Sequence, residues 1–181
     1  MTAAASTRRG LAAVAALWLA LIGGLVAVHE HRLRTGREVV LQTVPVDPRD
    51  LFRGDYVVLA YPMSALDVSA FGLDPAWYTV GQTVYVLLRQ EGRHAVPMGL
   101  LLGPPSNGAL FIRGQVTAVE GGRLRVEYGI ESYFVPEGQG LLLERARGDT
   151  LEVVAVVDAS GRAAIKALRL EGKDVTFRQG A

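Results

Sequence analysis

The chain has no cysteine among its 181 residues. This absence excludes disulfide bonds, thiolate metal sites and cysteine nucleophiles, but it does not select a cellular compartment. Aromatic residues are also scarce, at 7% of the sequence, and no arginine-rich helix or basic face interleaved with aromatic residues occurs. The sequence therefore predicts that the protein does not bind nucleic acid.

Recognisable catalytic patterns are missing as well. The sequence has no Gly-x-Ser-x-Gly elbow, no HExxH pair, no EF-hand spacing and no glycine-rich phosphate loop. Histidine is rare, and His94 is the only one beyond residue 37, with no serine near it in the sequence. We therefore expect no catalytic residue, no metal site and no cofactor.

One long run, Gly10–Val28, contains 19 residues without a charge and accounts for much of the mean hydropathy of +0.24. As a helix rising ~1.5 Å per residue, this run would reach about 28 Å, close to the ~30 Å hydrocarbon core of a bilayer. We predict a transmembrane helix over residues 10–28, after a cytoplasmic N-terminus at 1–9 and before a charged neck at 29–37. A cleaved signal peptide is the alternative. It is disfavoured because cleavage after Ala27 would place Leu25, which is not small, at position −3.

The orientation of this helix depends on the charges at its two ends. Arg8 and Arg9 favour a cytoplasmic N-terminus, whereas three arginines between residues 32 and 37 compete with them. Residues 38–181 hold 14 basic and 17 acidic residues, a net charge of −3. Because long domains translocate largely regardless of charge, we predict a single pass with this domain outside the cytoplasm.

Beyond residue 38 the sequence has the pattern of short strands, which are rich in Val, Leu, Ile and Tyr and bounded by Gly, Pro, Asn or Asp. The predicted strands are Val39–Val44, Asp55–Tyr61, Gln82–Arg89, Leu110–Val119, Arg123–Tyr128, Leu151–Val157 and Ala163–Leu170. Hairpin turns are expected at 120–122 and 159–161, and helical turns at 64–71 and 75–78. We predict a mainly β fold over 38–181, a compact antiparallel β-barrel or sandwich-like domain with short helical turns.

The segment Pro45–Tyr61 reads PVDPRDLFRGDYVVLAY. Asp47, Pro48 and Asp50 have the pattern of a helix start, and Gly54 suits the left-handed residue that ends a single turn. A strand is expected to follow this turn.

Five charges lie within nine residues of that segment: Asp47, Arg49, Asp50, Arg53 and Asp55. They could form a carboxylate metal site or a clamp for an anionic ligand. The alternative is a capped turn held by its own Arg–Asp pairs. Local capping explains two of the aspartates without any ligand, so we favour the capped turn.

In the strand that follows, alternation places Asp55, Val57, Leu59 and Tyr61 on one face. Leu59 is predicted to lie in the core. Tyr56 and Tyr61 are expected to bury their rings and to satisfy their hydroxyls.

Two blocks of the sequence resemble the signatures of the bacterial GDYXXLXY family. The matching positions are Gly54, Asp55, Tyr56, Leu59 and Tyr61 in the first block, and Tyr133, Pro136, Glu137 and Gly138 in the second, which reads YFVPEG. The resemblance covers roughly residues 38–172. It implies an extracytoplasmic domain on one N-terminal helix, often encoded beside multi-spanning membrane proteins. It implies no catalytic residues, because none is established for the family.

The first block is also similar, more weakly, to the segment that follows the nucleophile of serine signal peptidases. Gly54-Asp55, Leu51 and Val57 match, but Val46 occupies the position of the nucleophilic serine. The similarity implies at most a related β-fold, because a valine cannot attack a carbonyl. A Ser–Lys pair would need Lys166, and a lysine in a strand more often faces solvent.

These observations favour a single-pass protein of the bacterial inner membrane with a periplasmic domain. We expect an accessory or protein-interaction module, bound to lipid through residues 10–28 and to a polytopic membrane protein. Glu137 is expected to pair with Arg49 or Arg53 and so join the two blocks, or alternatively to contact a partner. The competing functions are a degenerate signal-peptidase-like serine hydrolase that uses Lys166, and a small-ligand or cation sensor. The sensor would use Asp47, Asp50, Asp55 and Glu137.

Overall fold

The computed structural model describes residues 2–44, 52–53, 56–135 and 151–175, and for residues 2–13, 29, 31–33, 52, 53 and 56 it describes the backbone alone. The chain forms two units, residues 1–35 and residues 36–181. Each unit is described by itself below.

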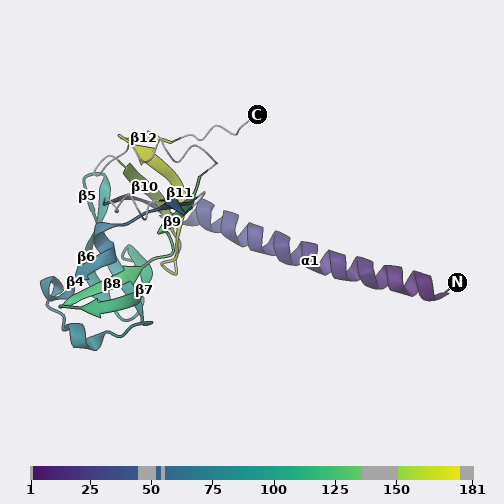
Figure 1. Cartoon of the computed structure of the whole chain (residues 1–181), viewed down its shortest axis with the longest axis horizontal. Helices are drawn as coiled ribbons and strands as arrows, with labels where there is room; N and C mark the ends of the chain where they lie inside the picture. Colours follow the sequence, from purple (N-terminus) through teal and green to yellow (C-terminus); the bar gives the residue numbers. More distant parts are fainter. Residues whose placement is uncertain (1, 45–51, 54–55, 136–150, 176–181) are drawn as a thin grey trace. The chain divides into compact units, whose positions relative to one another are not determined.

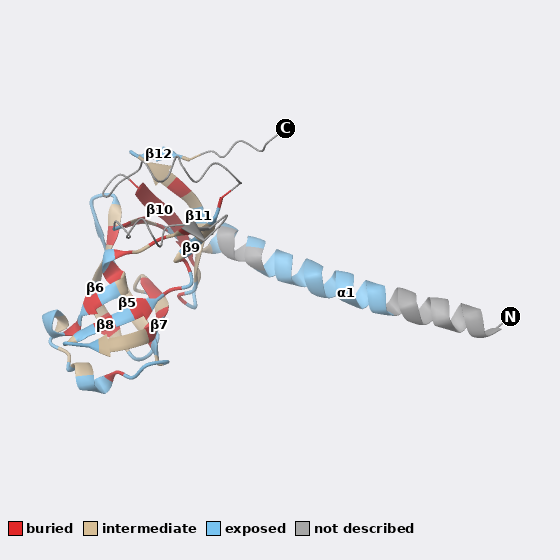
Figure 2. Ribbon diagram, in the orientation of Figure 1, coloured by how far each residue is buried: buried red, intermediate tan, exposed pale blue. Residues whose placement is uncertain are grey.

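The first unit is a single helix, α1 (Thr2–Thr35), which continues well beyond the predicted span at both ends. The helix includes residues 29–35 of the expected neck and ends before Gly36. Glu30 and Arg34, one turn apart, are joined by an ion pair of 2.9 Å. The apolar side chains from Val14 to Val28 are exposed, with Leu17 at 70% (Figure 2). Within the described residues, no helix combines the length and apolarity that a membrane crossing requires.

The second unit is mainly β, as predicted (Figure 1), and all the strand pairs among its described residues are antiparallel. Its strands are β1 (Arg37–Gln42), β2 (Phe52–Arg53), β3 (Tyr56–Val58), β4 (Ala65–Asp67), β5 (Thr83–Glu91), β6 (His94–Leu101), β7 (Phe111–Glu120), β8 (Arg123–Glu127), β9 (Ser132–Phe134), β10 (Leu151–Val157), β11 (Ala163–Leu170) and β12 (Lys173–Asp174). They form a four-stranded sheet in the order β1-β10-β11-β12, a three-stranded sheet β2-β3-β9 and a five-stranded sheet β4-β8-β7-β5-β6.

The expected helical turns are present, although a short strand interrupts the first. The 3₁₀ turns are η1 (Pro62–Ser64), η2 (Val68–Phe71) and η3 (Pro75–Trp77), and β4 separates η1 from η2. The Asp67 and Asp74 side chains accept hydrogen bonds from backbone N–H groups at the starts of η2 and η3. These are the side-chain caps that short helical turns need.

Strand β6 was not predicted, because Pro97 and the charged residues before it disrupt the strand pattern. The strand lies at the edge of the five-stranded sheet, where a proline costs no ladder hydrogen bond. Its pairing with β5 shifts between Leu87 and Leu88, opposite Pro97 and Gly99, so that Met98 is the extra residue of a bulge.

A single buried apolar cluster takes residues from all three sheets, including Val39 of β1, Val57 of β3 and Val86 of β5. Strand β10 is buried along its whole length because it lies between β1 and β11 and both of its faces are covered (Figure 2). Strands β1 and β6, the neighbouring edges of two sheets, are also in contact. The sheets of this unit therefore share one core.

The turn between β10 and β11 joins the four-stranded sheet to the five-stranded one. The Arg113 N–H donates to the Gly161 carbonyl at 2.7 Å. Gly161 has a φ of +80°, and a Cβ placed on it would lie 2.4 Å from the Phe111 ring. Glycine is thus required at this position for both its conformation and its size.

We expect Gly161→Ala to lower the free energy of unfolding by about 2–5 kcal/mol, since a left-handed alanine costs about 1–2 kcal/mol and overpacking about 1–3 kcal/mol. Gly81→Ala is the matched control, because Gly81 has a φ of +87° but open space around its Cβ position. Chemical denaturation of both variants checks the difference. Equal losses would show that the Phe111 contact is unimportant.

Candidate functional site

The two family-like blocks are hydrogen-bonded neighbours in the three-stranded sheet. Strand β3, from the first block, pairs with β9, from the second, and the register places Val57 opposite Tyr133. Beyond the ladder, the Leu59 N–H donates to the Glu131 carbonyl at 2.8 Å. Segments about 75 residues apart in the sequence therefore form one local structure.

Two buried tyrosines, one from each segment, donate hydrogen bonds to the backbone of the opposite segment. The Tyr61 hydroxyl donates to the Ile130 carbonyl at 2.6 Å, and the Tyr128 hydroxyl donates to the Met63 carbonyl at 2.6 Å. Each hydroxyl thus satisfies a backbone oxygen of the segment that carries the other tyrosine. We call these two tyrosines the tyrosine brace.

Glu131 holds the turn that joins β8 to β9. Its carboxylate accepts from the Tyr128 N–H at 2.6 Å and from the Gly129 N–H at 2.8 Å. Burial, and secondarily the negative charge of Glu131, raise the pKa of both Tyr61 and Tyr128 far above the ordinary value for tyrosine. Both hydroxyls therefore remain protonated donors throughout the physiological range.

The apolar residues of the first block whose side chains are described are buried, as predicted. Val57, Leu59 and Tyr61 share a face and are all buried, and the Tyr61 hydroxyl has the expected partner. Tyr133 is half-buried in β9. For Arg53 and Tyr56 only the backbone is described, and these two residues are register partners between β2 and β3.

The charged half of the motif lies outside the described residues. This applies to Asp47, Arg49, Asp50, Gly54, Asp55, Pro136, Glu137 and Gly138. The helix start, the ion pair of Glu137 and the cation site all depend on these residues. They stay predictions.

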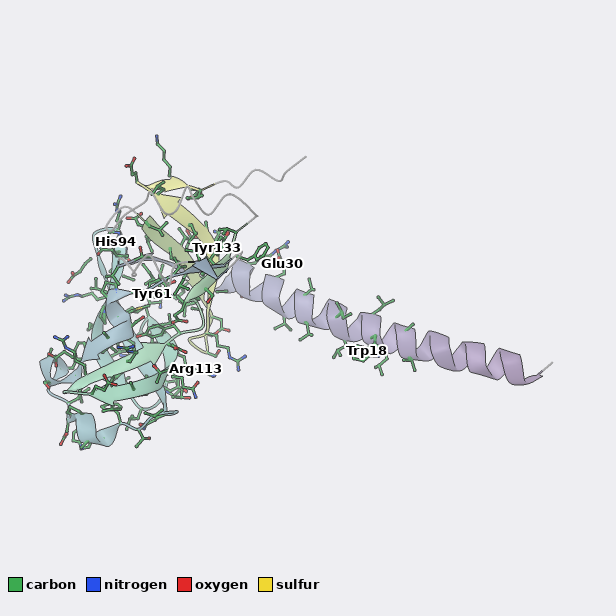
Figure 3. All side chains as sticks on the ribbon, viewed as in Figure 1. Trp18, Glu30, Tyr61, His94, Arg113 and Tyr133 are labelled. Carbon is green, nitrogen blue, oxygen red and sulfur yellow. The ribbon has the colours of Figure 1, made fainter. Side chains whose placement is uncertain are left out.

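A small pocket lies where the first block ends. Its volume is about 40 Å³, and its lining includes Tyr61, Pro62 and Met63 from the segment after β3, Leu41 and Gln42 of β1, and residues 94–97 of β6. Figure 3 labels Tyr61 and His94, two of its wall residues. Pockets for organic ligands usually measure about 300–1,000 Å³, so this one suits a few water molecules or one small side chain.

The pocket wall contains a histidine bonded to a buried carboxylate. His94 Nε2 lies 2.6 Å from Glu152 Oε1, and Arg93 Nη2 donates to the same oxygen at 2.8 Å. The Glu152 side chain is 2% exposed. Sequence reasoning missed this cluster because Glu152 lies in a strand that reads as apolar and is 58 residues from His94.

Lys166, on which the hydrolase hypothesis depends, lies on the exposed face of β11. Its Nζ is 2.5 Å from Glu38 Oε2, and about half of each side chain is exposed. This geometry matches a solvent-facing strand lysine in a surface ion pair, an arrangement that stabilises by at most about 1 kcal/mol.

We expect Tyr61→Phe and Tyr128→Phe each to lower the free energy of unfolding by about 1–2 kcal/mol, because each leaves a buried carbonyl without its donor. Tyr85→Phe is the control, since Tyr85 is half-buried and contacts Phe111 through its ring. Chemical denaturation measures all three. Equal losses in the three variants would contradict the brace.

The brace also predicts a response to alkali. The folded-state pKa of Tyr61 and Tyr128 is raised, so their contribution to stability is complete below the unfolded-state value of about 10 and declines as the pH rises above it. In an alkaline absorbance titration of the six tyrosines, Tyr61 and Tyr128 should ionise only when the domain unfolds; burial also raises the pKa of Tyr78. Smooth titration of all six at ordinary pH values, with the domain still folded, would contradict the burial of the brace.

Comparison with known proteins identifies the family. The model of the family described as "GDYXXLXY protein" matches residues 18–168, well over half of the chain. No curated protein and no solved structure matches. Strands β3 and β9, which carry described parts of the two signature blocks, both lie within the matched range. The chain belongs to the GDYXXLXY family.

Proposed function

We propose that the protein is a membrane-anchored accessory module whose β domain lies outside the cytoplasm and binds a polytopic membrane protein. The observation that carries this proposal is the pairing of β3 with β9. The described parts of the two signature blocks build the domain, and the pocket that Tyr61 lines has a volume of about 40 Å³.

The anchor is proposed from the sequence and from the exposure of α1. Residues 10–28 carry no charge, and from Val14 to Val28 the apolar side chains are exposed around the helix, Trp18 among them (Figure 3). Exposed apolar surface of this extent is costly in water and favourable in lipid. Insertion of residues 10–28 into a bilayer would remove that surface from water.

The volume of the described pocket and the side chains of the described residues are consistent with a protein-binding role for the domain. The pocket of about 40 Å³ leaves no room for an organic substrate, and no group of three metal-ligating side chains occurs among the described residues. We further propose that the sheets curl round their common core as a partial barrel, since the edges β1 and β6 meet. Such a domain offers its outer surface to a partner.

The absence of native cysteine gives a direct test of the anchor and its orientation. In bacterial cells with a permeabilised outer membrane, a membrane-impermeant maleimide should label Ser160→Cys in the domain and leave Ser6→Cys unlabelled until the inner membrane is broken. Both variants should remain with the membranes after alkaline carbonate washing. Release of the protein by the wash, or labelling of Ser6→Cys in intact inner membranes, would refute the proposed topology.

The partner is tested separately. The tagged full-length protein, crosslinked in cells and purified in mild detergent, should carry a multi-spanning membrane protein with it. An unrelated single-pass membrane protein with the same tag is the control. Recovery of the protein alone, after efficient crosslinking, would contradict the interaction.

A further inference from the structure

Arg113 of β7 carries a half-buried guanidinium that no hydrogen bond or ion pair joins to any of the described residues. Arg169 of β11 is also half-buried, but it binds Asp174 at 2.6 Å. A guanidinium has five N–H donors and no acceptor, so partial burial removes water that only an acceptor can replace. Arg113 therefore presents donors that the carboxylate of another molecule can satisfy.

The register of the five-stranded sheet places apolar and aromatic side chains beside Arg113. Its partner on β5 is Tyr85, whose own partner on β6 is Leu101, and all three residues are half-buried. The Tyr85 ring contacts the Phe111 ring, with the two centroids 5.8 Å apart. Because residues two apart on a strand share a face, Phe111 and Arg113 lie on the same side of β7. A row of apolar surface therefore ends at a cation.

The turn between β10 and β11 brings a second arginine to this side of the sheet. Gly161 lies against the Phe111 ring and accepts from the Arg113 N–H at 2.7 Å, and Arg162 is the next residue. The turn is fixed by Asp158, whose Oδ1 accepts from three donors, the Arg162 N–H among them at 3.0 Å. The Arg162 side chain is exposed, and within the described part of the chain it has no ion-pair partner. Arg113 is labelled in Figure 3.

We propose that Tyr85, Leu101, Arg113 and Arg162 form a docking surface for an acidic segment of the membrane-protein partner, an inference that rests on the proposed function. Carboxylates of that segment accept hydrogen bonds from the two guanidiniums, and the planar fork of Arg113 suits a bidentate contact. Apolar side chains of the same segment cover Tyr85 and Leu101. Arginine and tyrosine are the residue types that contribute most to binding at protein interfaces.

The charges around this docking surface favour a protein segment over an anionic lipid headgroup. Basic sites for membrane surfaces are clusters of exposed Lys and Arg side chains. Here Glu127 of β8, the register partner of Gln115, is exposed on the same side of the sheet and interrupts the positive charge. Residues 38–181 carry a net charge of −3, so an anionic membrane surface would repel the domain as a whole. A carboxylate placed between two arginines needs no such long-range attraction.

The first test reverses the two charges in the tagged full-length protein, which is crosslinked in cells and purified in mild detergent. Arg113→Glu and Arg162→Glu should each recover at least about ten-fold less multi-spanning protein than wild type, because like charges in an interface repel. Arg123→Glu is the matched control, since Arg123 is an exposed arginine at the start of β8, and it should recover the wild-type amount. The thermal midpoint of each variant checks that it is folded. Arg162→Glu changes an exposed turn residue and keeps the test valid if Arg113→Glu does not fold.

The outcomes separate the docking surface from the proposed function. Wild-type recovery in the folded reversal variants would overturn the docking surface and leave the proposed function standing. An equal loss in Arg123→Glu would also overturn it, because the effect would then follow from charge alone. If wild type itself recovers no multi-spanning protein, both proposals fall.

The second test identifies what touches the surface. A photocrosslinking amino acid in place of Arg162 should attach, in cells, to an acidic segment of a multi-spanning protein, and mass spectrometry of the adduct identifies that segment. The same amino acid in place of Arg123 should not attach to it. A phospholipid adduct at residue 162, or equal attachment from both positions, would overturn the proposal.

Discussion

The pairing of β3 with β9 is the constraint on which the rest of the domain depends. It brings together two segments that are far apart in the sequence, and the tyrosine brace fixes their relative position by burying one hydroxyl on each side. The Glu131 carboxylate holds the turn between β8 and β9 by accepting hydrogen bonds from two backbone N–H groups. The arrangement is sensitive to substitution, because the loss of a single donor leaves a buried carbonyl unsatisfied and lowers the stability of the fold.

This arrangement explains why the apolar part of the family motif is buried. The sequence predicts that Leu59 lies in the core and that the tyrosines of the motif bury their rings. In the fold, Leu59 and Tyr61 are buried, and the Tyr61 hydroxyl donates to the Ile130 carbonyl. Beside the motif, His94, which is bonded to the buried Glu152, lines the same small pocket as Tyr61. Tyr61 of the motif thus forms part of the wall of this pocket.

Much of the fold could be predicted from local pattern. Leu151–Val157 and Ala163–Leu170 were predicted at their observed bounds, because each is rich in apolar residues and is followed by turn residues. Alternation also gave the burial of Leu59 and Tyr61. Strand β6 could not be predicted, since an edge strand tolerates the proline that disrupts its pattern. The partners of Tyr61 and Glu152 could not be predicted either, because they lie 69 and 58 residues away and depend on the order of the strands.

The central claim, that the two signature blocks are in-register neighbours, is tested most directly by a disulfide introduced into a chain that has no cysteine. Val58 and Ser132 are register partners, whereas Ala60 and Ser132 are not. We predict that Val58→Cys/Ser132→Cys forms an intramolecular disulfide under mild oxidation and keeps the domain folded, and that Ala60→Cys/Ser132→Cys forms it much more slowly. Failure of the first pair to close in the folded protein, or equally rapid closure of both pairs, would contradict the account.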